Sequence, residues 1–277
     1  MTLGLLPARH LESTGYVRAV FTTRTGGVSR GPYAGLNLAL GVGDAPQAVA
    51  ENKRRLATAM GARPDSLVEA EQVHGTAVAV VGPGAGATVV PGVDALVTAA
   101  PGIWLAVYAA DCVPALVLDR GAPAIAALHA GWRGTASGVV AETLRRMRDV
   151  FGTDPARCSV ALGPAIGGCC YEVDAPVARA MESGPWWTES ARATGPGRWH
   201  LDLRGAVRRQ FIAGGVPGPE IEVVSECTKC RPDLFFSYRR DHVTGRMAAC
   251  IRLSERVASD ESVARSSRTP LTDLSGG

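Results

Sequence analysis

Residues 123–152, PAIAALHAGWRGTASGVVAETLRRMRDVFG, decide the fold, because they predict a strand, a glycine-rich turn and a helix in direct succession. The apolar run that ends at His129 is typical of a strand buried on both faces. Beyond the turn, apolar side chains recur at helical spacing up to Phe151, and Gly152 stands where a helix stops. A strand that leads through glycines into a helix indicates the α/β class.

The sequence before this unit continues the alternation of strands and helices. Residues 17–21 predict a short strand, and a helix is predicted from Asp44 as its N-cap, through Pro46, to Gly61. Four further apolar runs are expected to be buried strands: AVAVV, DALVT, IWLAVYA and PALVLD.

The sequence after the unit predicts strands at residues 158–162, 221–224 and 247–253, with helices at 174–182 and 205–213. No repeat and no linker interrupts this alternation, so one domain is expected over residues 17–257. Residues 1–16 are expected to form an N-terminal extension. Residues 258–277 are polar and are expected to form a disordered tail.

The composition is typical of a soluble globular protein. Among 277 residues, 29 Lys and Arg oppose 26 Asp and Glu without forming a basic stripe, which argues against a nucleic-acid partner. The N-terminus lacks the cationic start of a signal peptide, and glycines and prolines break the long uncharged stretches, which argues against a membrane helix. Seven cysteines, an odd number, argue against a disulfide framework. We therefore expect a cytoplasmic protein, acting as a monomer.

Three residues at the edges of apolar runs could bind a metal: His74 in QVHGT, Cys112 in ADCVP and His129 in ALHAGW. Two imidazoles and one thiolate form a three-ligand set for Zn²⁺ that leaves a fourth position for water or substrate, as catalytic zinc sites do. The spacings match no compact zinc motif. An alternative interpretation is that two hydrogen-bonded histidines lie beside a buried cysteine without a metal.

The turn HAGWRGT is a candidate anion site. Gly131 and Gly134 allow backbone amides to approach a ligand, and Arg133 can form paired hydrogen bonds with a phosphate or carboxylate. Arg24 lies beside a similar glycine pair in TTRTGGVS. The simpler interpretation for each arginine is that it binds nearby backbone carbonyl groups.

Two cysteine pairs remain, Cys169 with Cys170 in GPAIGGCCYE and Cys227 with Cys230 in CTKC. Adjacent cysteines are poor disulfide partners and poor joint metal ligands, and the CxxC lacks both a second pair and a following helix. All four are therefore predicted to be structural thiols. Glu172, on the same glycine-rich loop, could act as a general acid or base, although a solvated carboxylate is the simpler interpretation.

Eight motifs in one order resemble the bacterial YfiH family, whose members have been called laccase-domain proteins, polyphenol oxidases and zinc-dependent purine nucleoside phosphorylases. The motifs span residues 21–253 and read FTTRTGGVS, GLNLALGVGD, QVHGT, DALVT, ADCVPALVLD, HAGWRG, GPAIGGCCYEV and CTKCRPDLFFSYRRDHVTGRMAACIRL. The resemblance implies an α/β/β/α layered fold with mixed sheets, a cytoplasmic enzyme, and a zinc ion held by His74, Cys112 and His129.

The resemblance also implies an activity. It implies phosphorolysis of adenosine, inosine and S-methyl-5'-thioadenosine to the free base and a pentose 1-phosphate, with adenosine deaminase activity beside it. Some members have been linked to editing of peptidoglycan precursors, which is an alternative role. The chain departs from the family pattern at Gly168, where relatives often have proline, and at Val207, where they often have asparagine.

The candidate mechanisms use these residues differently. For phosphorolysis, Arg133 and Arg24 are the candidates for binding phosphate. For deamination, zinc would activate a water, with Glu172 or Asp111 as the proton shuttle.

Two rival activities share the same residues. The fold also resembles that of toxin deamidases, so Cys112 as nucleophile and His129 as base would make a cysteine hydrolase. Copper oxidation is disfavoured, because a blue-copper site and a three-copper cluster together need more histidines than the five present. A partner protein without catalytic activity is the least favoured class.

Overall fold

The computed structural model describes residues 2–63, 66–184 and 186–255; the tail predicted at 258–277 lies outside these residues. The predicted helices are present. In chain order the helices are α1 (Arg9–Glu12), α2 (Pro46–Met60), α3 (Trp132–Ser137), α4 (Val139–Phe151), α5 (Ala175–Met181), α6 (Trp187–Ser190), α7 (Leu203–Ala213) and α8 (Tyr238–Asp241).

The strands form two large sheets and one small sheet. The first sheet has the order β1 (Leu5–Pro7), β2 (Val17–Thr22), β15 (Met247–Leu253), β7 (Trp104–Ala109), β3 (Leu67–Ala70) and β5 (Thr88–Val90). The second sheet has the order β14 (Ile221–Val223), β10 (Cys158–Leu162), β8 (Val113–Asp119), β9 (Ala124–Ala130), β6 (Ala95–Thr98) and β4 (Val78–Val80). The small sheet has the order β11 (Glu172–Asp174), β13 (Arg198–Leu201) and β12 (Ala191–Gly195).

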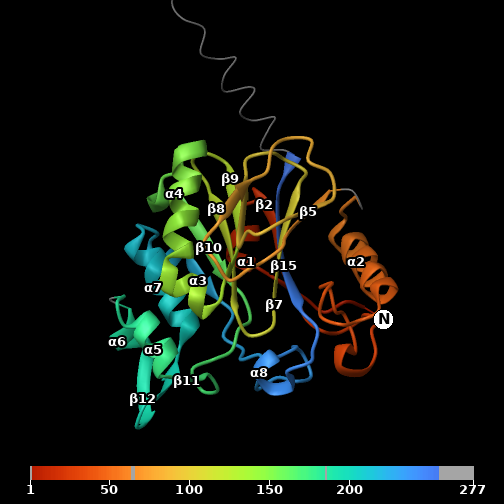
Figure 1. Cartoon of the computed structure of the whole chain (residues 1–277). Helices are drawn as coiled ribbons and strands as arrows, with labels where there is room; N and C mark the ends of the chain where they lie inside the picture. Colours follow the sequence, from red (N-terminus) through yellow and green to blue (C-terminus); the bar gives the residue numbers. More distant parts are fainter. Residues whose placement is uncertain (1, 64–65, 185, 256–277) are drawn as a thin grey trace, which may run out of the picture.

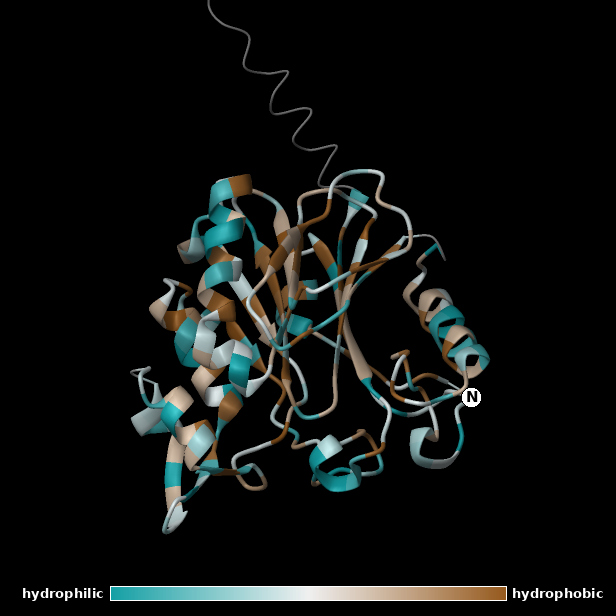
Figure 2. Cartoon of the chain, in the orientation of Figure 1, coloured by the Kyte–Doolittle hydropathy of each residue, from teal (hydrophilic) through white to brown (hydrophobic). Residues whose placement is uncertain are grey.

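The two large sheets pack face to face, and helices cover both outer faces (Figure 1). Apolar side chains from both sheets, among them Leu105 and Leu116, form the core between them. Outside the first sheet, Leu56 of α2 packs with Trp104, and outside the second sheet, helices α4 and α7 complete another core. Hydrophobic residues are concentrated on the strands that lie between the two outer helical layers (Figure 2). This arrangement is the α/β/β/α layering with mixed sheets expected from the sequence.

Strands β8 and β9 are buried along their whole length although they pair with each other in antiparallel fashion. Such continuous burial is more typical of parallel strands, because antiparallel sheets often leave one face in water. Here the first sheet covers one face and α4 packs on the other. The register places Pro114 opposite His129, so the start of β8 lies beside the end of β9.

The start of α2 differs from the sequence expectation. The N-cap of α2 is Ala45 and not Asp44, because the Asp44 carboxylate accepts hydrogen bonds from Ser29 and Asn37 at 2.6 and 2.9 Å. The helix ends at Gly61, as predicted, with φ of 64°.

The segment 1–16, expected to form an extension, contributes β1 and α1, and β1 pairs with β2 at the edge of the first sheet. In the described ranges, no helix has both the length and the apolar character needed to cross a membrane.

Candidate active site

Three elements bring the predicted metal ligands together. His74 lies in the segment after β3, Cys112 lies between β7 and β8, and His129 is near the end of β9. The Cys112 Sγ lies 3.9 Å from His74 Nε2, and the two imidazole rings meet edge to face with centroids 4.8 Å apart. One ligand atom from each residue lies within 4.8 Å of the other two, so the group could hold a metal ion. We call these three residues the His/Cys group.

A buried carboxylate that the sequence did not single out orders this group. The Asp94 side chain is fully buried and its Oδ1 lies 2.8 Å from His129 Nδ1. The same carboxylate accepts hydrogen bonds from the backbone N–H groups of Val73, His74 and Gly75. These bonds hold His74 in a left-handed conformation, with φ of 60°, that a residue with a side chain rarely adopts. Asp94 therefore orients both histidines, as carboxylates beside metal-binding histidines do.

The signal for Asp94 was present in the sequence. It is the acidic residue at the start of the run DALVT, immediately before the buried strand β6. A carboxylate at a buried position requires hydrogen-bond donors, so an aspartate next to a buried strand is a candidate for a structural or functional role.

Charges within the group favour a thiolate at Cys112. Burial raises the pKa of the Cys112 thiol, but the positive charge of His129 and hydrogen bonds from both histidines outweigh it and lower the pKa to about 6. Burial conversely lowers the pKa of His129, while the Cys112 charge and the Asp94 hydrogen bond raise it to about 9. In the metal-free protein the pair is therefore a thiolate and an imidazolium at neutral pH, and a metal ion would displace the imidazolium proton.

The two glycines of the HAGWRGT turn serve close packing. A Cβ atom at Gly131 would lie 2.8 Å from His74 Cδ2 and 3.1 Å from Cys112 Sγ. A Cβ atom at Gly134 would lie 2.8 Å from the Gly75 carbonyl oxygen. Both contacts are shorter than van der Waals distances allow, so these positions let α3 approach the His/Cys group. Neither Gly131 nor Gly134 lines the neighbouring cavity.

A cavity of about 760 Å³ contains the His/Cys group in its wall. Its size lies within the range of about 300–1,000 Å³ that is usual for small-molecule sites. Three arginines line it, and within the described part of the chain none of their guanidinium groups pairs with a carboxylate: Arg133, Arg239 and Arg246. The cavity thus combines a group of metal-binding character with guanidinium groups that can bind an anionic ligand, and the carboxylates of Glu69, Glu71 and Asp111 also line it.

Aromatic rings and backbone carbonyls position these arginines. Arg133 stacks on Trp132 with the guanidinium carbon 4.4 Å from the ring centroid, and Arg239 lies 4.9 Å from the ring of Tyr171. The Arg246 guanidinium donates to the carbonyls of residues 244 and 245. Arg239 and Arg246 were not among the predicted site residues, although both lie in the motif SYRRDHVTGRMA.

The other predicted site residues have different surroundings. Asp111 lines the cavity, but its carboxylate accepts hydrogen bonds from the Thr228 hydroxyl at 2.5 Å and the Arg239 backbone N–H at 2.6 Å. Its φ of 96° is strained for a residue other than glycine, so these bonds fix the turn that presents Cys112. Asp111 is a positioning residue in this geometry.

Arg24 and Glu172 do not line the cavity. The Arg24 guanidinium donates to the carbonyls of Ala34 and Pro232, as in the simpler interpretation. The Glu172 carboxylate forms an ion pair with Arg198 of β13. Expectations of phosphate binding by Arg24 and proton transfer by Glu172 are therefore not supported by their positions.

Known proteins resemble this chain in both sequence and structure. A family model described as multi-copper polyphenol oxidoreductase laccase matches residues 18–254. The structure resembles that of the YfiH protein of Bacillus licheniformis with a TM-score of 0.87 and 34% identity, covering 91% of this chain and 97% of that chain. The chain belongs to the YfiH family.

Other YfiH-family proteins carry names that refer to an activity. The purine nucleoside phosphorylase YlmD of Geobacillus stearothermophilus is 43% identical over 84% of this chain and 89% of its own length. Its crystal structure matches with a TM-score of 0.82, covering 86% of this chain and 92% of that one. A purine nucleoside phosphorylase of Corynebacterium glutamicum is 44% identical over 86% of this chain and 94% of its own length. Relatives that cover most of the chain are thus named for nucleoside phosphorolysis.

Proposed function

We propose that this chain is a zinc-dependent purine nucleoside phosphorylase that acts on adenosine, inosine and S-methyl-5'-thioadenosine, with adenosine deaminase activity at the same site. The observation that carries the proposal is the shared cavity, where a three-ligand His/Cys group lies beside arginines that pair with no carboxylate in the described chain. Phosphorolysis needs positive charge to hold phosphate against the anomeric carbon of a bound nucleoside. The relatives' names support the same reaction class.

The donor set of the His/Cys group fits zinc. Two imidazole nitrogens and one thiolate suit Zn²⁺, and three protein ligands are the number found in catalytic zinc sites. When bound, the metal supplies Lewis-acid polarisation of a ligand oxygen. Asp94 holds the His129 ring through Nδ1, so Nε2 is the nitrogen available to the metal. Copper oxidation remains disfavoured, because the five histidines are too few for a laccase.

The arginines account for phosphate binding. Arg133 and Arg246 line the cavity. Burial lowers the pKa of Arg246, and the negative charges of Cys112 and Asp111 partly offset this effect. A phosphate oxygen attacks the anomeric carbon as the glycosidic bond breaks, and the bonding pair passes to the purine nitrogen. Paired hydrogen bonds from arginine orient the phosphate for this attack.

The leaving purine must be bound and stabilised by a hydrogen-bond donor. Tyr171 lines the cavity, and burial raises the pKa of its phenol, so the hydroxyl keeps its proton and can donate to a ligand. The ring also offers a flat apolar surface for a base. Asp111, committed to Thr228 and Arg239, keeps the turn of Cys112 in place and does not transfer a proton.

The experiment measures base release from adenosine and inosine by the purified protein with and without phosphate, and identifies the sugar product. Release that requires phosphate and yields pentose 1-phosphate is expected. Release at equal rates without phosphate contradicts a phosphorylase. Conversion of adenosine to inosine in the same assay tests the deaminase activity.

Two variants test whether phosphorolysis depends on the metal of the His/Cys group. His74→Ala is expected to lose the zinc ion of the His/Cys group and phosphorolysis together. His10→Ala is the matched control, because His10 pairs with Glu220 and does not line the cavity. Phosphorolysis that survives both chelation and loss of His74 contradicts the zinc requirement.

A second candidate function has its own support. Asp94, His129 and Cys112 form a chain of contacts similar to the acid, base and nucleophile of a cysteine hydrolase, with Asp94 Oδ1 2.8 Å from His129 Nδ1. Zinc and a free nucleophile are incompatible at Cys112. An amide-hydrolysing activity that rises when zinc is removed and disappears in Cys112→Ser supports the hydrolase; one that requires zinc excludes it.

A further inference from the structure

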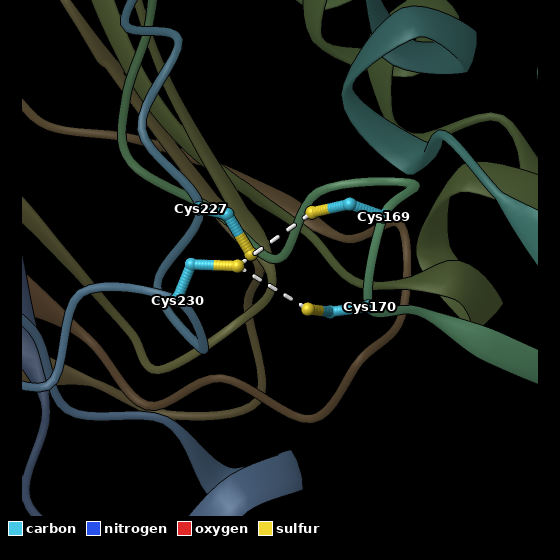
Figure 3. A group of neighbouring side chains, drawn as sticks. All are labelled: Cys169, Cys170, Cys227 and Cys230. Atoms are coloured by element: carbon cyan, nitrogen blue, oxygen red, sulfur yellow. Dashed lines mark hydrogen bonds between the residues drawn. The ribbon is translucent and has the colours of Figure 1, made fainter.

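Four cysteine side chains from two loops point toward one another (Figure 3). Their sulfur atoms all lie within 4.8 Å of one another. The members of this cysteine cluster are Cys169, Cys170, Cys227 and Cys230. The sequence predicted structural thiols packing around separate tight loops, because adjacent cysteines are poor joint ligands and the CxxC lacks a second pair. The fold supplies that second pair from the other loop.

We propose that the cysteine cluster binds a second metal ion, a thiophilic divalent cation such as Zn²⁺, that joins the two loops. In a tetrahedral site with Zn–S bonds of about 2.3 Å, neighbouring sulfurs are about 3.8 Å apart. The Sγ of Cys230 lies 3.8 Å from that of Cys169 and 3.4 Å from that of Cys170. Four thiolates with no open position form the pattern of a structural site.

The backbone around the cluster suits thiolate ligands. The Gly167 N–H donates to Cys227 Sγ at 3.2 Å, and such hydrogen bonds stabilise a metal-bound thiolate. A Cβ atom at Gly167 would lie 3.1 Å from Cys169 Sγ, so this position favours glycine. Cys227 is buried, whereas Cys169 and Cys230 are exposed and leave a path for the metal.

Positive charge lies next to the cluster. A divalent ion with four thiolates has a net charge of −2, which requires compensation when partly buried. The nearly buried Arg204 guanidinium donates to three carbonyls that immediately precede Cys227: those of Val224, Ser225 and Glu226. The guanidinium is thus fixed beside the loop that carries two of the four ligands.

The two joined loops also form part of the cavity wall. The first loop contributes Ile166 and Tyr171 to the lining, and the Ile166 N–H donates to the Asp111 carbonyl. The second loop carries Thr228, whose hydroxyl donates to the Asp111 carboxylate and whose N–H donates to the Ala165 carbonyl. A metal in the cluster therefore stabilises both contacts that hold the turn before Cys112.

A disulfide is the competing arrangement. An S–S bond is about 2.0 Å long, so the Cys230 sulfur would have to move more than an ångström closer to the sulfur of Cys169 or Cys170. One disulfide would also leave two of the four converging sulfurs without a role. Four thiolates around one ion use all of them.

The test counts metal on the full-length protein purified under reducing conditions. The unaltered chain is expected to hold two metal ions, and a His74→Ala/Cys112→Ala variant to hold one. Adding Cys169→Ser and Cys230→Ser to that variant is expected to remove the last ion. The matched control adds Cys158→Ser and Cys250→Ser to the His74→Ala/Cys112→Ala variant. These two buried cysteines lie outside both groups, so the control is expected to keep its one metal ion.

Two measurements keep the proposal falsifiable if the serine variants do not fold. Cobalt in place of zinc in the His74→Ala/Cys112→Ala variant is expected to give the intense sulfur-to-metal absorption of a tetrahedral thiolate site. The intact mass of the unaltered chain is expected to be that of seven free thiols. A mass lower by two or four hydrogens, or a metal count that falls to zero with His74→Ala/Cys112→Ala alone, overturns the proposal.

Discussion

The His/Cys group lines the cavity, whereas the cysteine cluster does not, and the two are built on different parts of the fold. Two members of the His/Cys group lie at or beside the paired ends of β8 and β9, and Asp94 at the start of the neighbouring β6 orients it. The cysteine cluster lies on two loops that contact each other through a β-bridge between Ala165 and Cys227 and a hydrogen bond from the Gly167 N–H to Cys227 Sγ. Strand pairing and Asp94 hold the first arrangement without a metal, whereas we expect the second to depend on the proposed metal. A rigid, three-ligand group suits chemistry, and a closed, four-ligand cluster suits stability.

The largest expected effect tests this division of roles. Cys112→Ala is expected to lower the rate of phosphorolysis by more than about 100-fold. Loss of a residue that only hydrogen-bonds to a metal ligand typically costs about 10- to 100-fold, and loss of the metal ligand itself is expected to cost more. Its melting temperature should change little, since β8 and β9 remain packed. Cys230→Ser is expected to lower the melting temperature while turnover persists below it. Differential scanning calorimetry and initial rates measure both, and the reverse pattern would contradict the comparison.

Asp94→Asn tests whether the rigid group depends on its carboxylate. The change keeps the size of the side chain but removes its charge, so metal affinity at the His/Cys group is expected to fall about 10- to 100-fold. Competition with a zinc chelator measures the affinity. The cysteine cluster serves as the internal control, because its metal should resist the chelator as in the unaltered chain.

Removing Arg133 affects only ligand binding. Arg133→Ala is expected to raise the KM for phosphate about tenfold, near the lower end of the cost of losing a charged hydrogen bond. Metal content at both sites should stay unchanged. Arg24→Ala is the control, since the Arg24 guanidinium binds the carbonyls of Ala34 and Pro232 and does not line the cavity. Equal effects from both variants would remove Arg133 from the phosphate site.

The pH dependence of alkylation is expected to distinguish Cys112 from Cys250 in the metal-free protein. The pKa of Cys112 is lowered to about 6, so its thiolate is present above that pH and its reaction with iodoacetamide slows about tenfold per pH unit below it. Burial raises the pKa of Cys250 to about 12, so this thiol stays protonated and unreactive through the same range. Mass spectrometry of the modified peptides follows each site. A midpoint for Cys112 near that of an ordinary thiol would show that His129 does not stabilise the thiolate.

Local pattern predicted the longer helices and the buried central strands, but not short elements such as β1, β5 and α8. Apolar runs marked the buried strands, and the resemblance tied His74, Cys112 and His129 to one site. Arg239 and Arg246 could not be assigned from pattern, because Arg239 lies in α8 and Arg246 between α8 and β15, and only the layered fold brings these segments to the cavity. The cysteine cluster was missed for the same reason. Its two halves are 57 to 61 residues apart, and no local rule predicts that their loops meet.

The register that places Pro114 opposite His129 has a consequence for quality control of the folded chain. Successive side chains of a strand point to opposite faces, so a slip of one residue between β8 and β9 would turn His129 away from Cys112. A chain that formed this sheet in the wrong register would retain hydrophobic side chains on both faces and could still collapse. It would hold no metal at the His/Cys group, so metal occupancy would report whether an individual molecule had reached its native pairing.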